Sequence, residues 1–224
     1  MFVFDSSKPQ RDGALENAVV LHELTHGLSN RLTGGADNAN CLSTPESGGL
    51  GEGWSDIVAI ALEMEDIDTP TTPKVVGQYV TNDPKKGVRQ FAFSTDMNVN
   101  PHKFSDGQKT KEVHAVGEIW TSMLFEVYWN MVNKSGFDKS FRTNPQGAAG
   151  NNQFLKTLVA AMKTQPCNPT FTDARDAMLA ADKAMTGGKY QCEISNGFAK
   201  RGLGINAQSD GKFVDDFTVP PNCK

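Results

Sequence analysis

The sequence of 224 residues predicts a mainly α-helical fold with at most one short strand, at the N-terminus. Apolar residues recur at helical spacing in several stretches, and only residues 1–4 form a short apolar run typical of a strand. Proline and glycine interrupt the segments between these stretches, where they end helices. The predicted helices cover residues 14–32, 51–65, 112–133, 152–163, 171–185 and 193–202.

The first predicted helix, residues 14–32, has Leu15, Val19, Leu24 and Leu28 at helical spacing and is followed by a pair of glycines. Residues 36–49 are rich in Asn, Ser and Gly, which predicts a loop. The second helix then begins near Gly51. Residues 83–111 are irregular, and a loop of this length within a domain is usually functional or well packed.

The clearest helix covers residues 112–133. Its apolar residues form one stripe, as expected of a helix that packs against a core. They are Val116, Ile119, Trp120, Met123, Leu124, Val127 and Met131.

Charge and composition exclude several classes of function. The chain has 22 Lys and Arg against 26 Asp and Glu, a net charge of −4, with no basic patch of the kind that binds nucleic acid. It has no stretch of about 18 apolar residues, so no membrane span is expected. Residues 1–5 lack the features of a signal peptide. We expect one helical unit over residues 1–224, monomeric, that begins within a longer protein.

Four cysteines, Cys41, Cys167, Cys192 and Cys223, predict two disulfides and an oxidising compartment. None lies in a C-x-x-C pair, which argues against a cysteine-bound zinc. Three connectivities are possible. We favour Cys167–Cys192 with Cys41–Cys223, and buried free thiols are the alternative. The sequon at residues 133–135 also fits secretion.

A metal-binding motif, H-E-x-x-H, lies in the first predicted helix. His22 and His26 are four residues apart, so their imidazoles lie on one face of the helix and can bind one metal ion. Glu23 lies beside them and can reach a water molecule at that metal. The alternative is a chance pair of histidines on a polar helix face.

A third ligand is required, because catalytic zinc typically has three protein ligands and one open position. Glu52, at the predicted start of the second helix, is the best candidate. Asp56 is one turn further on and could accept a hydrogen bond from the free ring nitrogen of His22 or His26. The alternative for Glu52 is a solvated acid at a helix N-terminus, where the dipole favours it.

Two further histidines have different predicted roles. His114 lies at the start of the helix of residues 112–133 and off its apolar stripe. It could therefore donate a hydrogen bond to a developing oxyanion. A surface histidine is the alternative. His102 lies in the irregular segment, and we predict that it is on the surface.

Three stretches, HELTHGLSNRLTGG, GLGEGWSD and VHAVGEIW, resemble the fungalysins, which are secreted fungal zinc metalloendopeptidases of the thermolysin-like class. The similarity extends from residue 1 to about residue 207. It implies one catalytic Zn²⁺ bound by His22, His26 and Glu52, with Glu23 as the catalytic base.

The same resemblance implies two residues around the metal. His114 matches the histidine that stabilises the oxyanion in thermolysin-like enzymes. Arg89 occupies the place of an arginine that supports substrate binding and the acidic residues of the site, although the surrounding loop differs in length.

The resemblance also implies a fold, the helical C-terminal lobe of a thermolysin-like peptidase. Family members carry a secretion signal, a pro-segment and a β-rich N-terminal lobe before the H-E-x-x-H helix, and of these only one strand, residues 1–4, is expected here. Substrate normally lies between the two lobes.

We therefore expect a secreted zinc metalloendopeptidase that acts on proteins or peptides, with part of its substrate cleft supplied by the missing lobe. One alternative is a zinc-binding module without activity, and another is a metal-free structural domain.

Overall fold

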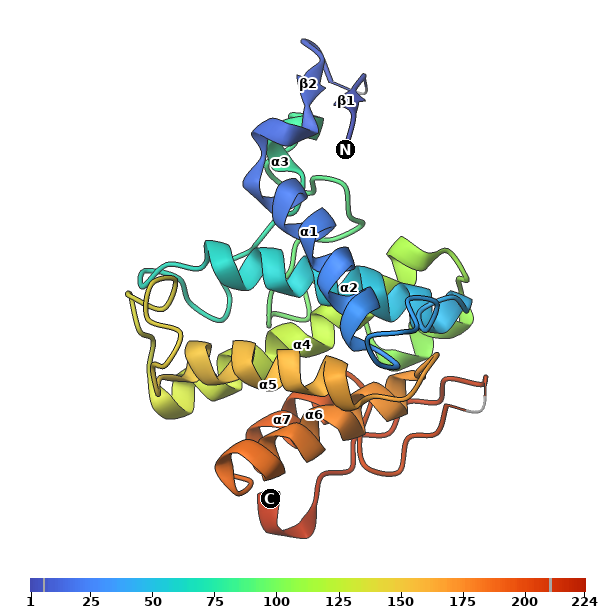
Figure 1. Cartoon of the computed structure of the whole chain (residues 1–224), viewed down its shortest axis with the longest axis vertical. Helices are drawn as coiled ribbons and strands as arrows, with labels where there is room; N and C mark the ends of the chain where they lie inside the picture. Colours follow the sequence, from blue (N-terminus) through green and yellow to red (C-terminus); the bar gives the residue numbers. More distant parts are fainter. Residues whose placement is uncertain (6, 210) are drawn as a thin grey trace.

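Helices stack in successive layers along the long axis of the molecule (Figure 1). The computed structural model describes residues 1–5, 7–209 and 211–224. The order of layers runs from a small β-hairpin and α1 at one end, through α2, α4 and α5, to α6 and α7 at the other. The helices are α1 (Asn17–Leu32), α2 (Pro45–Glu63), α3 (Gln78–Thr81), α4 (Val113–Ser135), α5 (Gly150–Thr164), α6 (Phe171–Thr186) and α7 (Gln191–Lys200). Short 3-10 helices cover Gly13–Leu15, Phe104–Gln108 and Pro221–Cys223.

The prediction of a mainly helical fold is confirmed. The expected N-terminal strand is β1 (Val3–Phe4), and it pairs antiparallel with a second short strand, β2 (Arg11–Asp12), that the sequence did not reveal. Val3 pairs with Asp12 and Phe4 with Arg11. In the described part of the chain no helix is long and apolar enough to cross a membrane.

Helix α1 packs through a different face from the one that its leucines mark. Leu15, predicted to belong to this helix, is 72% exposed and lies in the 3-10 helix that precedes α1. Leu24 is 70% exposed, while the buried side includes Ala18, Val19 and His22. Small and polar side chains line this side because α1 lies directly against α2, where the predicted metal ligands meet. Leucine spacing therefore identified the helix and did not identify its packed face.

Helix α2 begins at Pro45, six residues before the predicted Gly51, so the predicted loop of residues 36–49 is wrong at its end. Thr44 caps the helix by accepting a hydrogen bond from the Ser47 backbone N–H at 3.1 Å, and proline is favourable at the first helical position. The glycines of this stretch obscured that signal. Glu52 consequently lies two turns inside α2 and is not a solvated residue at its N-terminus.

Helices α2 and α4 approach each other closely because glycines lie at their crossing. A Cβ at Gly53 would lie 2.7 Å from the carbonyl oxygen of Gly117, and a Cβ at Gly117 would lie 2.5 Å from Cβ of Glu52. Side chains at these positions would separate the helices. This contact fixes where Glu52 lies relative to α4.

The core lies between α2, α4 and the C-terminal helices. The apolar stripe predicted for α4 is buried throughout. Trp120 at its centre packs edge-on against Trp54 of α2, with ring centroids 5.1 Å apart, and stacks on Phe198 of α7 at 5.3 Å. Aromatic contacts of this kind join the layers into one hydrophobic core.

Two disulfides are present, as predicted, but the favoured pairing is wrong: the bonds join Cys41 to Cys167 and Cys192 to Cys223. The loop after α1 runs beside the loop between α5 and α6, where the Asn168 backbone N–H donates to the Cys41 carbonyl at 2.8 Å. The C-terminal tail folds back on α7. Neither of these two chain contacts can be inferred from the spacing of the cysteines.

The long segment between α3 and α4 is well packed. Arg201, fully buried, donates to backbone carbonyls of Ser94, Asn100 and His102, and pairs with Glu126 of α4. These bonds satisfy backbone groups that form no regular structure. His102 is only 7% exposed, so its predicted place on the surface is wrong.

Candidate metal centre

Helices α1 and α2 bring three candidate ligands together. One turn separates His22 from His26, and their Nε2 atoms lie 3.0 Å apart. Glu52 reaches across from α2, with its carboxylate oxygens 3.1 Å from Nε2 of His22 and 3.5 Å from Nε2 of His26. The three ligand atoms thus face a single point between the helices.

The separations and the donor types fit a zinc ion. Tetrahedral ligands at the usual Zn–N and Zn–O distances lie about 3.3 Å from one another. The ligand atoms of His22, His26 and Glu52 all lie within 4.8 Å of one another, and among the described residues no other cluster of His, Cys, Asp and Glu meets this criterion. Imidazole nitrogen and carboxylate oxygen are both good zinc ligands.

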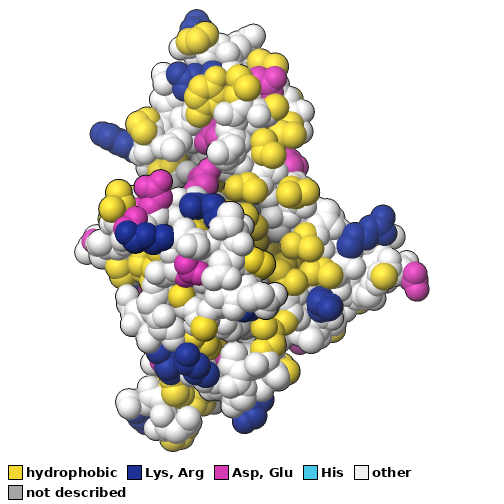
Figure 2. Space-filling view, turned by 60° about the vertical axis from the view of Figure 1, so that its left-hand side comes forward, with side chains coloured by type: hydrophobic (Ala, Val, Ile, Leu, Met, Phe, Trp, Pro, Cys, Tyr) yellow, Lys and Arg dark blue, Asp and Glu magenta, His cyan; other side chains and the backbone are white. Residues whose placement is uncertain are grey.

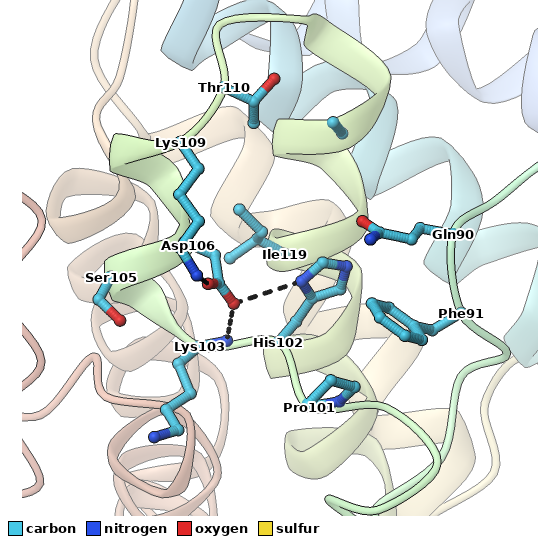
Figure 3. Close-up of a pocket in the computed structure, with 11 residues that line it drawn as sticks. Gln90, Phe91, Pro101, His102, Lys103, Ser105, Asp106, Lys109, Thr110 and Ile119 are labelled. Atoms are coloured by element: carbon cyan, nitrogen blue, oxygen red, sulfur yellow. Dashed lines mark hydrogen bonds and ion pairs between the residues drawn. The ribbon is translucent and has the colours of Figure 1, made fainter.

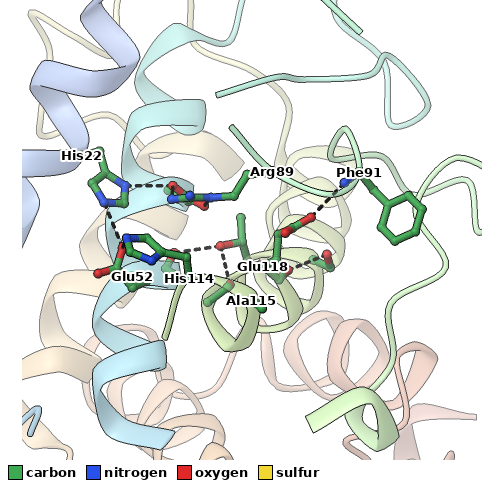
Figure 4. Close-up of polar contacts among 12 residues, drawn as sticks. His22, Glu52, Arg89, Phe91, His114, Ala115 and Glu118 are labelled. Carbon is green, nitrogen blue, oxygen red and sulfur yellow. Dashed lines mark hydrogen bonds and ion pairs between the residues drawn. The ribbon is translucent and has the colours of Figure 1, made fainter. Parts of the chain in front are cut away.

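Asp56 and Arg89 hold one of these ligands, His22, in place. Figure 4 shows Arg89 beside His22. His22 Nδ1 lies 2.8 Å from Asp56, and the Arg89 Nε and Nη2 groups donate to the same carboxylate at 2.7 and 2.8 Å. Burial raises the pKa of Asp56, but the charge of Arg89 and the hydrogen bonds from His22 and Arg89 together outweigh it, and the net shift is downward. Asp56 is therefore a carboxylate that accepts the Nδ1 hydrogen and leaves the Nε2 lone pair of His22 for a metal.

Electrostatics at this point favour a cation. Burial lowers the pKa of His22, but its hydrogen bonds with Asp56 and Glu52 raise it to about 9 in the metal-free protein. Burial also raises the pKa of Glu52, and hydrogen bonds with His22 and His26 more than reverse this, so that its pKa falls well below the usual range. Positive charge, whether a proton or a metal ion, is stabilised here.

His114 lies at the N-terminus of α4, facing the same centre. Its Nε2 is 3.5 Å from Glu52, and its Nδ1 is 2.6 Å from Glu112, the residue that caps α4. Glu112 also accepts the backbone N–H groups of His114 and Ala115. Sequence reasoning missed Glu112, although an acid just before a helix that carries a histidine in its first turn was a usable signal.

Glu23 follows His22 on α1, and its side chain is exposed. Its carboxylate forms no hydrogen bond or ion pair with the described residues, so it is available to a bound molecule. The predicted site residues on α1, α2 and α4, together with Arg89, thus meet in one region of the fold.

A hollow of about 700 Å³ lies beside this centre (Figure 3). Residues just after Arg89 and the first turns of α4 form two of its walls, and the segment around His102 forms a third. Lining residues are Gln90, Phe91, Pro101, His102, Lys103 and Ile119 with five others. The candidate metal site and the hollow are therefore both built on the segment around Arg89 and on the start of α4.

Charged side chains are dispersed over the face shown in Figure 2. Lys and Arg occur there in small groups among acidic, polar and apolar side chains. Such a surface lacks the continuous basic patch that binding to nucleic acid needs.

Two histidines one turn apart with a glutamate between them, a third ligand from the next helix and a mainly helical fold together define a metal centre of the metallopeptidase type. The known proteins place the chain more narrowly. The sequence model of the fungalysin metallopeptidase family (M36) matches residues 1–207, and the chain belongs to this family.

Several fungal proteins are similar to this chain in sequence. Extracellular metalloproteinase MEP of Leptosphaeria maculans is 45% identical over 225 residues, covering 98% of this chain and 35% of that protein. Probable extracellular metalloproteinase 1 of Arthroderma benhamiae is 46% identical over all of this chain and 36% of its own length, and extracellular metalloproteinase 2 of Trichophyton rubrum is 41% identical over the same shares. The chain spans about a third of the length of these relatives.

Proposed function

We propose that this chain carries the catalytic centre of a secreted zinc metalloendopeptidase that hydrolyses peptide bonds in extracellular proteins. The convergence of His22, His26 and Glu52, with Glu23 beside them, carries this proposal. A bound Zn²⁺ would polarise the scissile carbonyl and make a water molecule more acidic. Family membership and the names of the relatives, which are extracellular metalloproteinases, support a metal-dependent protease.

His22, His26 and Glu52 would hold the zinc. Asp56 keeps the imidazole of His22 in the tautomer that binds metal, and Arg89 keeps Asp56 charged and oriented. These two residues act by holding a ligand in place. Mutation of such supporting residues typically lowers metal affinity or activity 10- to 100-fold.

Glu23 is the proposed general base. It would take a proton from the attacking water and deliver it to the leaving amine nitrogen. His114 would donate a hydrogen bond from Nε2 to the oxygen of the scissile carbonyl as negative charge develops there. Glu112 accepts the Nδ1 hydrogen of that ring and so fixes its orientation.

Arg89 is proposed to bind substrate as well as to orient Asp56. A substrate chain would run past α1 and the start of α4, and the rest of the cleft would come from a second lobe in a longer protein. We propose that the chain itself is one helical lobe and a monomer, with proteins or peptides as its partners.

Glu23→Gln tests the mechanism. Glutamine cannot accept the proton, so turnover of a quenched fluorescent peptide should fall by about 10²- to 10⁴-fold while zinc content stays stoichiometric. Glu65→Gln, which changes an exposed acid after the end of α2, serves as the control and should keep wild-type turnover. Retention of the wild-type rate in Glu23→Gln would show that this mechanism is wrong.

The same assay separates the alternative, a zinc-binding module without activity. Folded, zinc-loaded wild-type protein that shows no chelator-sensitive turnover would favour that alternative. Absence of stoichiometric zinc after purification without chelator would instead favour a metal-free structural domain.

A further inference from the structure

One carboxylate of α4 holds the chain segment that follows Arg89. Phe91 donates its backbone N–H to Glu118 Oε1 at 2.9 Å (Figure 4). Glu118 is only 4% exposed and lies one turn after His114. Because Phe91 is two residues from Arg89, this hydrogen bond ties the substrate-binding arginine to the helix that carries the proposed oxyanion donor.

His102 contacts the same carboxylate. Its Nε2 lies 3.5 Å from Glu118. Its Nδ1 lies 3.4 Å from Asp106, as Figure 3 shows. The edge of its ring meets the ring of Phe91, with centroids 5.0 Å apart. Glu118 and His102 together form an anchor for residues 89–91.

Arg89 needs such an anchor because its guanidinium has two tasks. Nε and Nη2 donate to Asp56, which leaves Nη1 for a substrate carbonyl. The planar fork can serve both only if the backbone at residue 89 stays in place. A displacement of about 1 Å in a positioning group can cost up to 100-fold in rate.

We propose that Glu118, supported by His102, is a positioning residue that fixes the Arg89 guanidinium for substrate binding. This inference rests on the proposed endopeptidase function. Glu118 touches neither the substrate nor the metal ligands in this role, and it acts through the backbone of residues 89–91.

Two variants separate the hydrogen bond from the charge. Glu118→Asp keeps the charge but withdraws the acceptor by one methylene, so the bond to Phe91 is lost. Glu118→Gln keeps an amide oxygen in reach of Phe91 and loses the charge. Glu126→Asp is the matched control, because Glu126 is also a buried acid of α4 and its partners are Lys200 and Arg201.

Steady-state kinetics on a quenched peptide provide the first measurement. Glu118→Asp should raise KM about tenfold with kcat within about twofold, because Arg89 would bind the ground state and the transition state alike. Glu118→Gln should stay within about threefold of wild-type KM. Glu126→Asp should lower the melting temperature and leave KM unchanged.

Hydrogen–deuterium exchange over residues 87–93 provides a measurement that does not depend on activity. Exchange in this peptide should accelerate in Glu118→Asp and stay close to wild type in Glu118→Gln and Glu126→Asp.

An unchanged KM in Glu118→Asp, or an equal rise in Glu126→Asp, would overturn the inference. An inactive wild type would instead reject the proposed function, and exchange would still decide whether Glu118 holds this segment: unchanged exchange in Glu118→Asp rejects the anchor itself.

Discussion

Replacing Gly117 by alanine tests whether the close approach of α4 sets the position of Glu52, the proposed metal ligand. The new Cβ would lie 2.5 Å from Cβ of Glu52, 3.0 Å from the backbone nitrogen of Gly53 and 3.1 Å from the carbonyl oxygen of Gly49. Backbone atoms and a Cβ cannot move away by a change of rotamer. Either the two helices separate or Glu52 shifts.

The expected magnitude combines two opposing effects. Overpacking a dense contact costs about 1–3 kcal/mol. Alanine in place of glycine inside a helix stabilises by about 1 kcal/mol. We therefore expect Gly117→Ala to lower the free energy of unfolding of the metal-free protein by up to about 2 kcal/mol. Displacement of the Glu52 carboxylate should also weaken zinc binding about tenfold or more, in line with the usual effect of disturbing residues that support a metal ligand.

The assay is urea unfolding of metal-free protein, with a zinc titration against a competing chelator. Gly27→Ala is the control: Gly27 lies in α1, and a Cβ there would have no atom within 4 Å. The control should gain about 0.5–1 kcal/mol from helix propensity alone. Wild-type stability and zinc affinity in Gly117→Ala would refute the claim that this contact is rigid.

Two other predictions concern stability. Removing the Cys41–Cys167 bond by double alanine substitution should lower the free energy of unfolding by about 5 kcal/mol, and removing Cys192–Cys223 by about 3.5 kcal/mol. The first loss is larger because the bonded cysteines are 126 residues apart, against 31 for the second pair. Equal losses in urea unfolding would contradict this prediction. The buried Tyr128 hydroxyl has no hydrogen-bond partner among the described residues, and burial raises its pKa. Because the phenol of the unfolded chain ionises at a lower pH than the buried one, wild-type stability should fall as the pH rises above about 10. Tyr128→Phe should abolish this fall, and at pH 7 it should be neutral or stabilising by about 1 kcal/mol. Parallel pH profiles of the unfolding free energy for wild type and variant would argue against this prediction.

Local patterns were sufficient for most of the helices. Apolar spacing located α4 to within two residues of its observed ends, because the stripe faces one continuous core. The start of α2 depended on a cap, Thr44, followed by proline. Glycines in the same stretch lower helix propensity, and the packing of α4 against them compensates for it.

The site residues that lie close together in the sequence could be predicted to meet from their spacing alone, and those that lie far apart in the sequence could not. His22 and His26 are one helical turn apart, so their shared face follows from helix geometry alone. Glu52 was inferred from its residue type and the resemblance, and its contact with the histidines depends on how α2 crosses α1. Arg89 meets Asp56 only because a long irregular segment returns to the same place.

The sequence by itself determined the helical class, the metal-binding motif and the existence of two disulfides, because each depends on residue type and short spacing. The tertiary structure alone decided which cysteines pair, that His102 is buried, and that Glu118 holds the segment after Arg89. These contacts join residues that are distant in the chain, and no local periodicity encodes them. They arise where glycines let α2 and α4 approach and where Arg201 fixes an irregular segment on α4.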